Sequence, residues 1–203
     1  MSSPGRTRPP VNAHHLWDRE TSPMSDVAEL DIGVLVLDVL GTLVDEPAGV
    51  EDPAAVAALA LSGRRLPPWP DTVAGLARLA ERFVLVGLSN ASRTALLGLN
   101  AHAGLRWHQA LSAEDARAYK PDPEVYRLAV TVAGLPPERL LMVAAHAWDL
   151  RGAQALGLRT AYVARPVGDP PTASDRFDLY ADGLADLADQ LDALPGRKRS
   201  ARG

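Results

Sequence analysis

Short apolar runs alternate with longer segments of helical period from about residue 30 to residue 195. Six runs are predicted to be strands, the last two named being more weakly patterned: Gly33–Asp38, Phe83–Leu88, Leu140–Ala145, Thr160–Ala164, Trp107–Leu111 and Asp178–Ala181. Five other segments are predicted to be helices: Thr72–Glu81, Arg93–Ala101, Pro123–Ala133, Asp149–Leu156 and Leu184–Leu194. Val34–Leu37 is apolar at every position, which indicates burial on both faces of a sheet. The pattern predicts an α/β fold with a doubly wound parallel sheet between two helical layers.

The two ends of the chain lack this periodicity. Residues 1–29 are rich in Pro, Ser and Arg and are expected to form a disordered leader, with His14 and His15 solvated and Met24 a candidate natural start. Residues 196–203 are expected to be a short basic tail. One core domain is therefore predicted over 30–195, with an insertion at 46–68 that has room for one helix, Pro53–Leu61, and a loop.

Composition and charge exclude several classes of function. The 203 residues are 47% hydrophobic and 23% charged, as in ordinary globular domains. The net charge of -4, without basic clusters interleaved with aromatic residues, argues against a nucleic-acid partner. There is no cysteine, which excludes disulfides, thiolate metal sites and cysteine nucleophiles. The longest apolar run, Ile32–Leu37, is too short to cross a bilayer, so we expect no membrane partner and a cytoplasmic location.

Polar side chains lie at or after four predicted strand ends: Asp38, the pair Ser89 and Asn90, Lys120, and Asp149. Ligands of open parallel sheets bind beyond the carboxyl ends of the strands, so these side chains are candidates for chemistry. Each also has a structural interpretation: a turn for the first, a helix cap for the pair and for the last, and solvation for the lysine. Their occurrence together, in this order, favours one common site.

Four motifs of the chain resemble the haloacid dehalogenase superfamily, specifically the type II 2-haloacid dehalogenases. They are Leu37–Leu43, Leu88–Asn90, Tyr119–Tyr126, and Ala147–Asp149 followed by Gly152 and Ala153. The resemblance covers roughly 33–43 and 69–186 and implies a Rossmann-like core. It also implies that Asp38 is a nucleophile that forms an ester intermediate and that Lys120 lies close to it. Asp149 is then expected to position Lys120 and the hydrolytic water.

The resemblance further implies which residues contact the substrate. Ser89 and Asn90 are expected to bind its carboxylate, while Thr42 and Tyr126 shape the pocket. The full predicted set is Asp38, Lys120, Asp149 and Thr42 for catalysis, and Leu40, Ser89, Asn90, Tyr126 and His146 for substrate binding.

Leu40 separates two reactions that the superfamily performs. Its phosphatases typically carry a second aspartate two residues after the nucleophile, which protonates the departing alkoxide, and this chain has Leu40 there. A halide leaves as a stable anion and needs no proton. Asp38 needs no general base, since aspartate is ionised at neutral pH. We therefore predict a hydrolase of the (S)-2-haloacid dehalogenase type, acting on small 2-halocarboxylic acids.

No metal or other cofactor is expected to be required. Phosphatases of the superfamily hold Mg²⁺ through the nucleophile, a backbone carbonyl and an acid, which correspond here to Asp38, Leu40 and Asp149. Lys120 would compete for the same negative charge.

The chain departs from the type II pattern at the cap, a helical insertion that supplies an arginine for the halide. The segment at 46–68 is too short for a full cap, and its Arg64 and Arg65 do not match the family motif. His146 also replaces an asparagine, and Ala144 a serine. Two alternatives stay open, namely a Mg²⁺-dependent phosphatase and a cap-deleted, catalytically weak protein that binds a small carboxylate. The oligomeric state also stays open.

Overall fold

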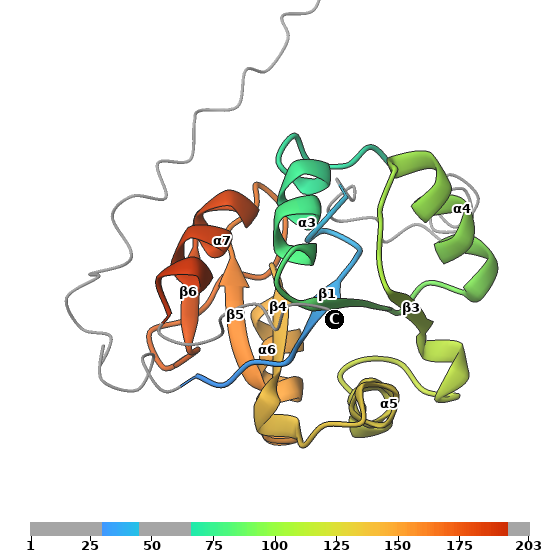
Figure 1. Ribbon diagram of the computed structural model, residues 1–203. Coiled ribbons are helices and arrows are strands. Elements are labelled where there is room, and N and C mark those ends of the chain that lie inside the picture. Colours follow the sequence, from blue (N-terminus) through green and yellow to red (C-terminus); the bar gives the residue numbers. More distant parts are fainter. Residues whose placement is uncertain (1–29, 45–65, 195–203) are drawn as a thin grey trace, which may run out of the picture.

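The computed structural model describes residues 30–44 and 66–194, and Figure 1 shows them as one sheet flanked by helices. The described residues form six parallel strands: β1 Val34–Asp38, β2 Val84–Ser89, β3 Gln109–Ser112, β4 Leu140–Ala144, β5 Arg159–Val163 and β6 Leu179–Ala181. Their order across the sheet is β3-β2-β1-β4-β5-β6, the order of dinucleotide-binding folds. The predicted doubly wound sheet is confirmed, and each predicted strand end lies within two residues of its observed position.

Five helices in the described ranges cover the sheet: α3 Thr72–Ala80, α4 Arg93–Ala103, α5 Pro123–Ala133, α6 Ala147–Ala155 and α7 Leu184–Ala193. Helices α3, α4 and α7 lie on one face, and α5 and α6 lie on the other (Figure 1). Two short 3-10 turns, η3 Ala113–Asp115 and η4 Pro137–Arg139, precede the loop of Lys120 and strand β4. The predicted bounds of α5 are confirmed, because Asp122 caps its start and Gly134 ends it with a φ of 63°.

Strand β1 is apolar at successive positions because both of its faces are buried. Leu35 and Leu37 pack into the core under α3, α4 and α7, whereas Val34 and Val36 pack into the core under α5 and α6. This alternation follows the two-residue period of a strand. The central position of β1 therefore places its last residue, Asp38, at the middle of the sheet edge.

One helix start differs from its prediction. Helix α6 begins at Ala147, two residues before the expected Asp149, and Asp149 is not its cap. The cap comes instead from the loop after β5, where Asp169 Oδ2 accepts a hydrogen bond from the amide of Trp148 at 2.9 Å. Gly168 permits this close approach, because its φ is 136° and a side chain there would meet a backbone oxygen at 2.5 Å.

The two ends of the chain segment that joins β1 to α3 lie side by side. Val44 pairs with Pro68 in an antiparallel bridge. The amide of Trp69 donates a hydrogen bond to the carbonyl oxygen of Leu43 at 3.1 Å. The described residues on either side of 45–65 are therefore neighbours.

Several predictions fall outside the described residues: the leader at 1–29, the basic tail at 196–203, the helix Pro53–Leu61, and the side chains of His14, His15, Arg64 and Arg65. Within the described ranges, none of the helices has the length and apolar character needed to span a membrane.

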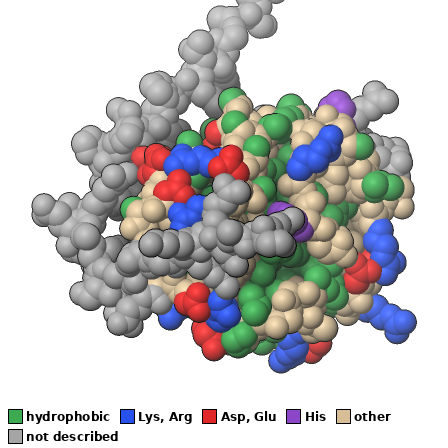
Figure 2. Space-filling model, viewed as in Figure 1, with side chains coloured by type: hydrophobic (Ala, Val, Ile, Leu, Met, Phe, Trp, Pro, Cys, Tyr) green, Lys and Arg blue, Asp and Glu red, His purple; other side chains and the backbone are tan. Residues whose placement is uncertain are grey.

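Ion pairs join α3 and the turn that follows it to α7 at the surface. Arg78 lies 2.7 Å from Asp189 and 2.5 Å from Asp192, and Arg82 lies 2.5 Å from Asp192. Figure 2 shows acidic and basic side chains mixed over this part of the molecule. Exposed ion pairs of this kind contribute little to stability because water screens them, so burial of apolar surface is what holds α3 against α7.

The buried face of α3 is expected to carry its contribution to stability. Leu76→Ala should lower the free energy of unfolding by about 2–5 kcal/mol, because it opens a cavity in a closed core. Val73, on the same helix, is 47% exposed, and Val73→Ala should change that free energy by only about 0.5 kcal/mol. Urea unfolding of the two variants measures the difference, and equal losses would contradict this assignment of the buried face.

Candidate active site

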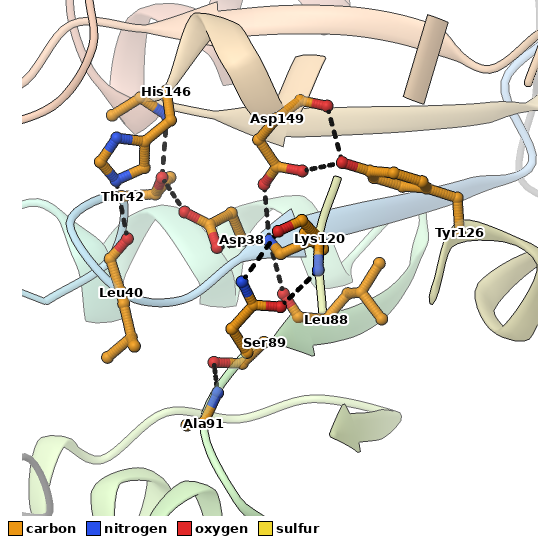
Figure 3. Close-up of polar contacts among 12 residues, drawn as sticks. Asp38, Leu40, Thr42, Leu88, Ser89, Ala91, Lys120, Tyr126, His146 and Asp149 are labelled. Atoms are coloured by element: carbon orange, nitrogen blue, oxygen red, sulfur yellow. Dashed lines mark hydrogen bonds and ion pairs between the residues drawn. The ribbon is translucent and has the colours of Figure 1, made fainter. Parts of the chain in front are cut away.

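Three buried charged side chains meet beyond the carboxyl ends of β1 and β4 (Figure 3). Lys120 Nζ lies 2.6 Å from Asp38 Oδ1 and 2.5 Å from Asp149 Oδ2. It donates a further hydrogen bond to the carbonyl oxygen of Leu88 at 3.2 Å. The exposed fractions of the three side chains are 1% for the lysine, 6% for Asp38 and 0% for Asp149. The structure thus brings together the three residues that the sequence assigns to one site.

Each of these residues reaches the site from a different element. Asp38 is the last residue of β1 and lies opposite Leu88 of β2 in the parallel register. Asp149 lies in the first turn of α6, directly after β4, and Lys120 lies just before α5. The strand order reverses between β1 and β4, which is where open α/β sheets bind their ligands.

Asn90 holds the backbone of Lys120. Its Oδ1 accepts a hydrogen bond from the amide of Lys120 at 2.7 Å, and its Nδ2 donates one to the carbonyl oxygen of Lys120 at 3.3 Å. Both polar atoms of the Asn90 side chain therefore bind the backbone of Lys120, whose ammonium pairs with the two carboxylates. The predicted contact of Asn90 with a substrate carboxylate stays a prediction.

Ser89 is fully buried at the end of β2. Its Oγ accepts a hydrogen bond from the amide of Ala91 at 3.1 Å, which leaves the direction of its own hydroxyl hydrogen unfixed by that bond. Its predicted role in substrate binding also stays a prediction.

Burial and neighbouring charge set the protonation of the buried residues. Burial alone would lower the pKa of Lys120, but the charges of Asp149 and Asp38 raise it above its usual 10.5. Burial, together with the negative charge of Asp38, raises the pKa of Asp149, against the opposing effects of Lys120 and Tyr126. Lys120 is therefore a cation at neutral pH, and it offsets the charge of two acids.

Tyr126 supports Asp149 from behind. Its hydroxyl donates to Asp149 Oδ1 at 2.6 Å and lies 3.1 Å from the Asp149 carbonyl oxygen. Tyr126 has no exposed surface, and a side chain at Gly152 would meet its hydroxyl at 2.6 Å. The predicted contribution of Tyr126 to the pocket stays a prediction, and the contact that the structure gives it with the site is the one to the carboxylate of Asp149.

Thr42 orients the other carboxylate. Its hydroxyl donates to Asp38 Oδ2 at 2.8 Å and accepts a hydrogen bond from the amide of Ala145 at 2.8 Å. Because the amide can only donate, the hydroxyl hydrogen of Thr42 must point at Asp38. With Lys120 on Oδ1 and Thr42 on Oδ2, both oxygens of Asp38 have a protein donor.

His146 lies over the backbone that follows the nucleophile. Its Nε2 lies 3.2 Å from the carbonyl oxygen of the partly buried Leu40, a hydrogen bond that requires the proton on Nε2. Gly41 makes room for the ring, since its φ is 75° and a side chain there would meet Nε2 at 2.5 Å. The predicted substrate contacts of Leu40 and His146 stay predictions.

The donor set does not suit a magnesium ion. Of the expected ligands, Asp38 and Asp149 share the ammonium of Lys120, and the carbonyl oxygen of Leu40 is engaged by His146. A divalent ion bound to the two carboxylate oxygens that face Lys120 would have to displace its ammonium. Across the described residues, no group of three His, Cys, Asp or Glu side chains is placed to hold a metal.

Sequence reasoning does not identify four residues that hold the backbone at 41–43, just after Asp38. Trp69, Thr72 and Arg165 bind its carbonyl oxygens, and Asp71 binds Arg165. Arg165 comes two residues after β5, so a search for polar side chains at every strand end would have found it. The other three bind backbone groups or Arg165 itself, and backbone acceptors leave no pattern in a sequence.

The chain matches the haloacid dehalogenase-like hydrolase family over residues 35–157. It is 37% identical over 128 residues to an (S)-2-haloacid dehalogenase of Xanthobacter autotrophicus, covering 62% of this chain and 49% of that protein. It is 35% identical over 103 residues to (S)-2-haloacid dehalogenase H-109 of Pseudomonas putida, covering 49% of this chain and 46% of that one. The chain thus spans about half the length of the curated relatives it matches.

Solved structures share the fold. A crystal structure of an L-2-haloacid dehalogenase superposes with a TM-score of 0.68 at 31% identity, covering 80% of this chain and 99% of that one. A HAD phosphatase from Thermococcus onnurineus superposes with a TM-score of 0.64 at 15% identity, covering 81% of this chain and 100% of that one. The second likeness is one of fold alone. The fold therefore does not distinguish carbon–halogen cleavage from phosphate ester hydrolysis.

The hydrogen bond from Tyr126 to Asp149 is expected to stabilise the buried cluster. Tyr126→Phe should lower the free energy of unfolding by about 1–3 kcal/mol, because Asp149 Oδ1 loses its donor inside the core. Tyr119→Phe is the matched control, since Tyr119 is 66% exposed, and it should change that free energy by no more than about 0.5 kcal/mol. Urea unfolding at neutral pH compares them, and a loss in the control as large as in Tyr126→Phe would refute the assignment.

Proposed function

This chain belongs to the haloacid dehalogenase-like hydrolase family, and within that family we propose that it hydrolyses the carbon–halogen bond of small (S)-2-halocarboxylic acids. The observation that carries the proposal is the ammonium of Lys120 between the carboxylates of Asp38 and Asp149, with Leu40 two residues after Asp38. The curated relatives that the chain resembles bear the name of this activity.

The first step is attack of an Asp38 carboxylate oxygen on the halogen-bearing carbon. A carbon–oxygen bond forms, the carbon–halogen bond breaks, and the halide leaves with the bonding electron pair. Lys120 and Thr42 hold the two oxygens of Asp38 in place, which orients the nucleophile before the substrate arrives. Because a halide needs no proton, the apolar side chain of Leu40 suffices where a phosphatase would need an acid.

The second step is hydrolysis of the ester on Asp38. Water attacks the ester carbonyl carbon, the acyl carbon–oxygen bond breaks, and Asp38 is regenerated. One proton of the water ends on the 2-hydroxy acid and the other is released. Asp149 is the group that accepts the proton from water, since it lies across the Lys120 ammonium from Asp38 and is held by Tyr126. The halogen-bearing carbon is attacked only in the first step, so the product has the inverted configuration at that carbon.

Substrate binding is assigned to the rim of this cluster. Ser89 and the backbone amide of Asn90 are proposed to receive the substrate carboxylate, with Leu40 and His146 beside the halogen-bearing carbon. Thr42 and Tyr126 act through the carboxylates that they hold. No cofactor is required in this scheme, because Lys120 supplies the positive charge that a metal would bring. The cytoplasmic location stays an expectation from the sequence.

The proposal predicts halide release that depends on Asp38 and not on metal. Halide released from (S)-2-chloropropionate should continue in EDTA, whereas Asp38→Asn should lower the rate at least about a thousandfold. A single turnover in ¹⁸O-water should leave the label in Asp38, because water attacks the ester and not the substrate carbon. Mass spectrometry of the peptide that contains Asp38 detects it.

The same assay separates the alternatives. Release of phosphate from generic esters that requires Mg²⁺ would favour a phosphatase. Tight binding of a small carboxylate by wild type and Asp38→Asn, with no turnover by either, would favour a binding protein. Undiminished halide release by Asp38→Asn would remove Asp38 from its role.

The raised pKa of Asp149 predicts the acid limb of the pH profile. As the pH falls through this pKa, Asp149 is protonated and loses both its pairing with Lys120 and its ability to accept a proton, so kcat should fall at a pH above the ordinary 3.8 of aspartate. The raised pKa of Lys120 keeps the rate level through the mildly alkaline range. Asp149→Asn should lower kcat by about 10²–10⁴-fold and abolish this limb. An unchanged limb in Asp149→Asn would assign it to another group.

A further inference from the structure

The backbone that follows the nucleophile is tied at four consecutive carbonyl oxygens. The ties are His146 Nε2 to Leu40 at 3.2 Å, Trp69 Nε1 to Gly41 at 3.1 Å, Arg165 Nε to Thr42 at 2.8 Å and Thr72 Oγ1 to Leu43 at 2.8 Å. The four side chains come from separate places in the fold: before and within α3, before α6, and after β5. Side chains from outside the loop therefore fix its course at every residue.

The tie from Arg165 differs from the others, because it falls on the residue that holds Asp38. The carbonyl oxygen of Thr42 accepts from Arg165, and the hydroxyl of the same residue donates to Asp38 Oδ2 at 2.8 Å. The amide of Ala145 fixes that hydroxyl from a third direction at 2.8 Å. A displacement of Arg165 would therefore be passed to the nucleophile through one residue.

Arg165 is itself held in place by Asp71. Its Nη1 lies 2.9 Å and 3.0 Å from the two oxygens of Asp71, and the two side chains are 7% and 27% exposed. Asp71 Oδ2 also accepts from the amide of Leu184 at the start of α7, at 2.8 Å. The guanidinium lies over the ring of Trp69, 5.8 Å from its centre. Arg165 is thus bound to the backbone of Thr42 and to Asp71, the residue just before α3, and Asp71 in turn binds the start of α7.

Protonation agrees with this arrangement. Burial alone would raise the pKa of Asp71, but the hydrogen bond from Arg165 and the amide of Leu184 lower it. The ion pair is therefore complete at neutral pH.

We propose that Arg165, braced by Asp71, is a positioning residue for the nucleophile: it sets the orientation of the Asp38 carboxylate through Thr42 and does not touch the substrate. The expected kinetic effect rests on the proposed function, because it presumes that Asp38 attacks the substrate. The orientation itself does not depend on any reaction.

The geometry requires a guanidinium. Arg165 donates from Nε to Thr42 and from Nη1 to Asp71, two directions that a rigid planar fork can serve together. A lysine has one ammonium nitrogen, which can pair with Asp71 or reach Thr42 but cannot reproduce both bonds at these positions. Arg165→Lys therefore keeps the charge and removes the link.

The test compares Arg165→Lys and Arg165→Met with Arg159→Met. Arg159 is on β5 itself, and it pairs with Asp178 at 3.1 Å away from the site, so it controls for the loss of an arginine ion pair on this strand. Both Arg165 variants should lower kcat by about tenfold to a hundredfold with KM nearly unchanged, because the reacting oxygen is misplaced while the carboxylate-binding groups are intact. Arg159→Met should leave kcat at the wild-type value.

A second readout does not need turnover. The carboxyl carbon of Asp38, labelled with ¹³C and assigned by its loss in Asp38→Asn, should shift its resonance in the Arg165 variants and not in Arg159→Met. Asp71→Asn should reproduce the shift in part, which keeps the test available if Arg165→Met does not fold.

The two readouts separate this inference from the proposed function. A shifted resonance in a protein whose wild type releases no halide would support the positioning role and defeat the haloacid proposal. An unshifted resonance in Arg165→Lys overturns the positioning role, whether kcat falls or not. A loss of kcat shared equally by Arg159→Met would also overturn it, because the effect would then be one of general stability.

Discussion

One ammonium group between two carboxylates is the interaction around which the rest of the site is built. Asp38 and Asp149 are both nearly or fully buried, and two negative charges so placed would repel each other without Lys120 between them. Removing charges from water costs several kcal/mol for each ion, so the cluster is stable only where its remaining atoms are also paired. Thr42 and Tyr126 provide that pairing, one for each acid. The cluster is therefore a unit in which each residue depends on the others.

The two acids nevertheless differ in what they can do. Asp149 has no exposed surface and is fixed by a tyrosine hydroxyl, whereas Asp38 retains a small exposed fraction at the end of a central strand. This difference in exposure agrees with the proposed division, in which Asp38 attacks the substrate carbon and Asp149 acts on the water of the second step. The difference arises from the fold, because β1 ends at the sheet edge while α6 carries Asp149 back over the strands. Two chemically identical side chains thus differ in exposure because their backbones place them differently.

Much of this arrangement can be predicted from the sequence, and the exceptions have a common cause. The central strands β1 and β4 are predictable because burial on both faces leaves apolar runs, and Asp38 and Asp149 because each comes at or soon after such a run. Lys120 lies eight residues beyond β3 and is predicted from the motif Tyr119–Tyr126. The start of α6 is missed because its cap, Asp169, lies in a loop far along the chain. Arg165 and Trp69 are missed because they bind backbone oxygens, which every residue possesses. Hydrogen bonds from side chains to backbone groups are therefore the part of this site that the sequence does not predict.

The bridge between Val44 and Pro68 places the two described stretches that flank residues 45–65 next to each other. The backbone at 40–43, just after Asp38, is anchored by four side chains from elsewhere in the fold, and the bridge lies directly beyond it. Segments of different length could then be exchanged at this junction without altering the catalytic backbone. Insertions or deletions at this junction can therefore change the substrate range during evolution while the geometry around Asp38 is kept.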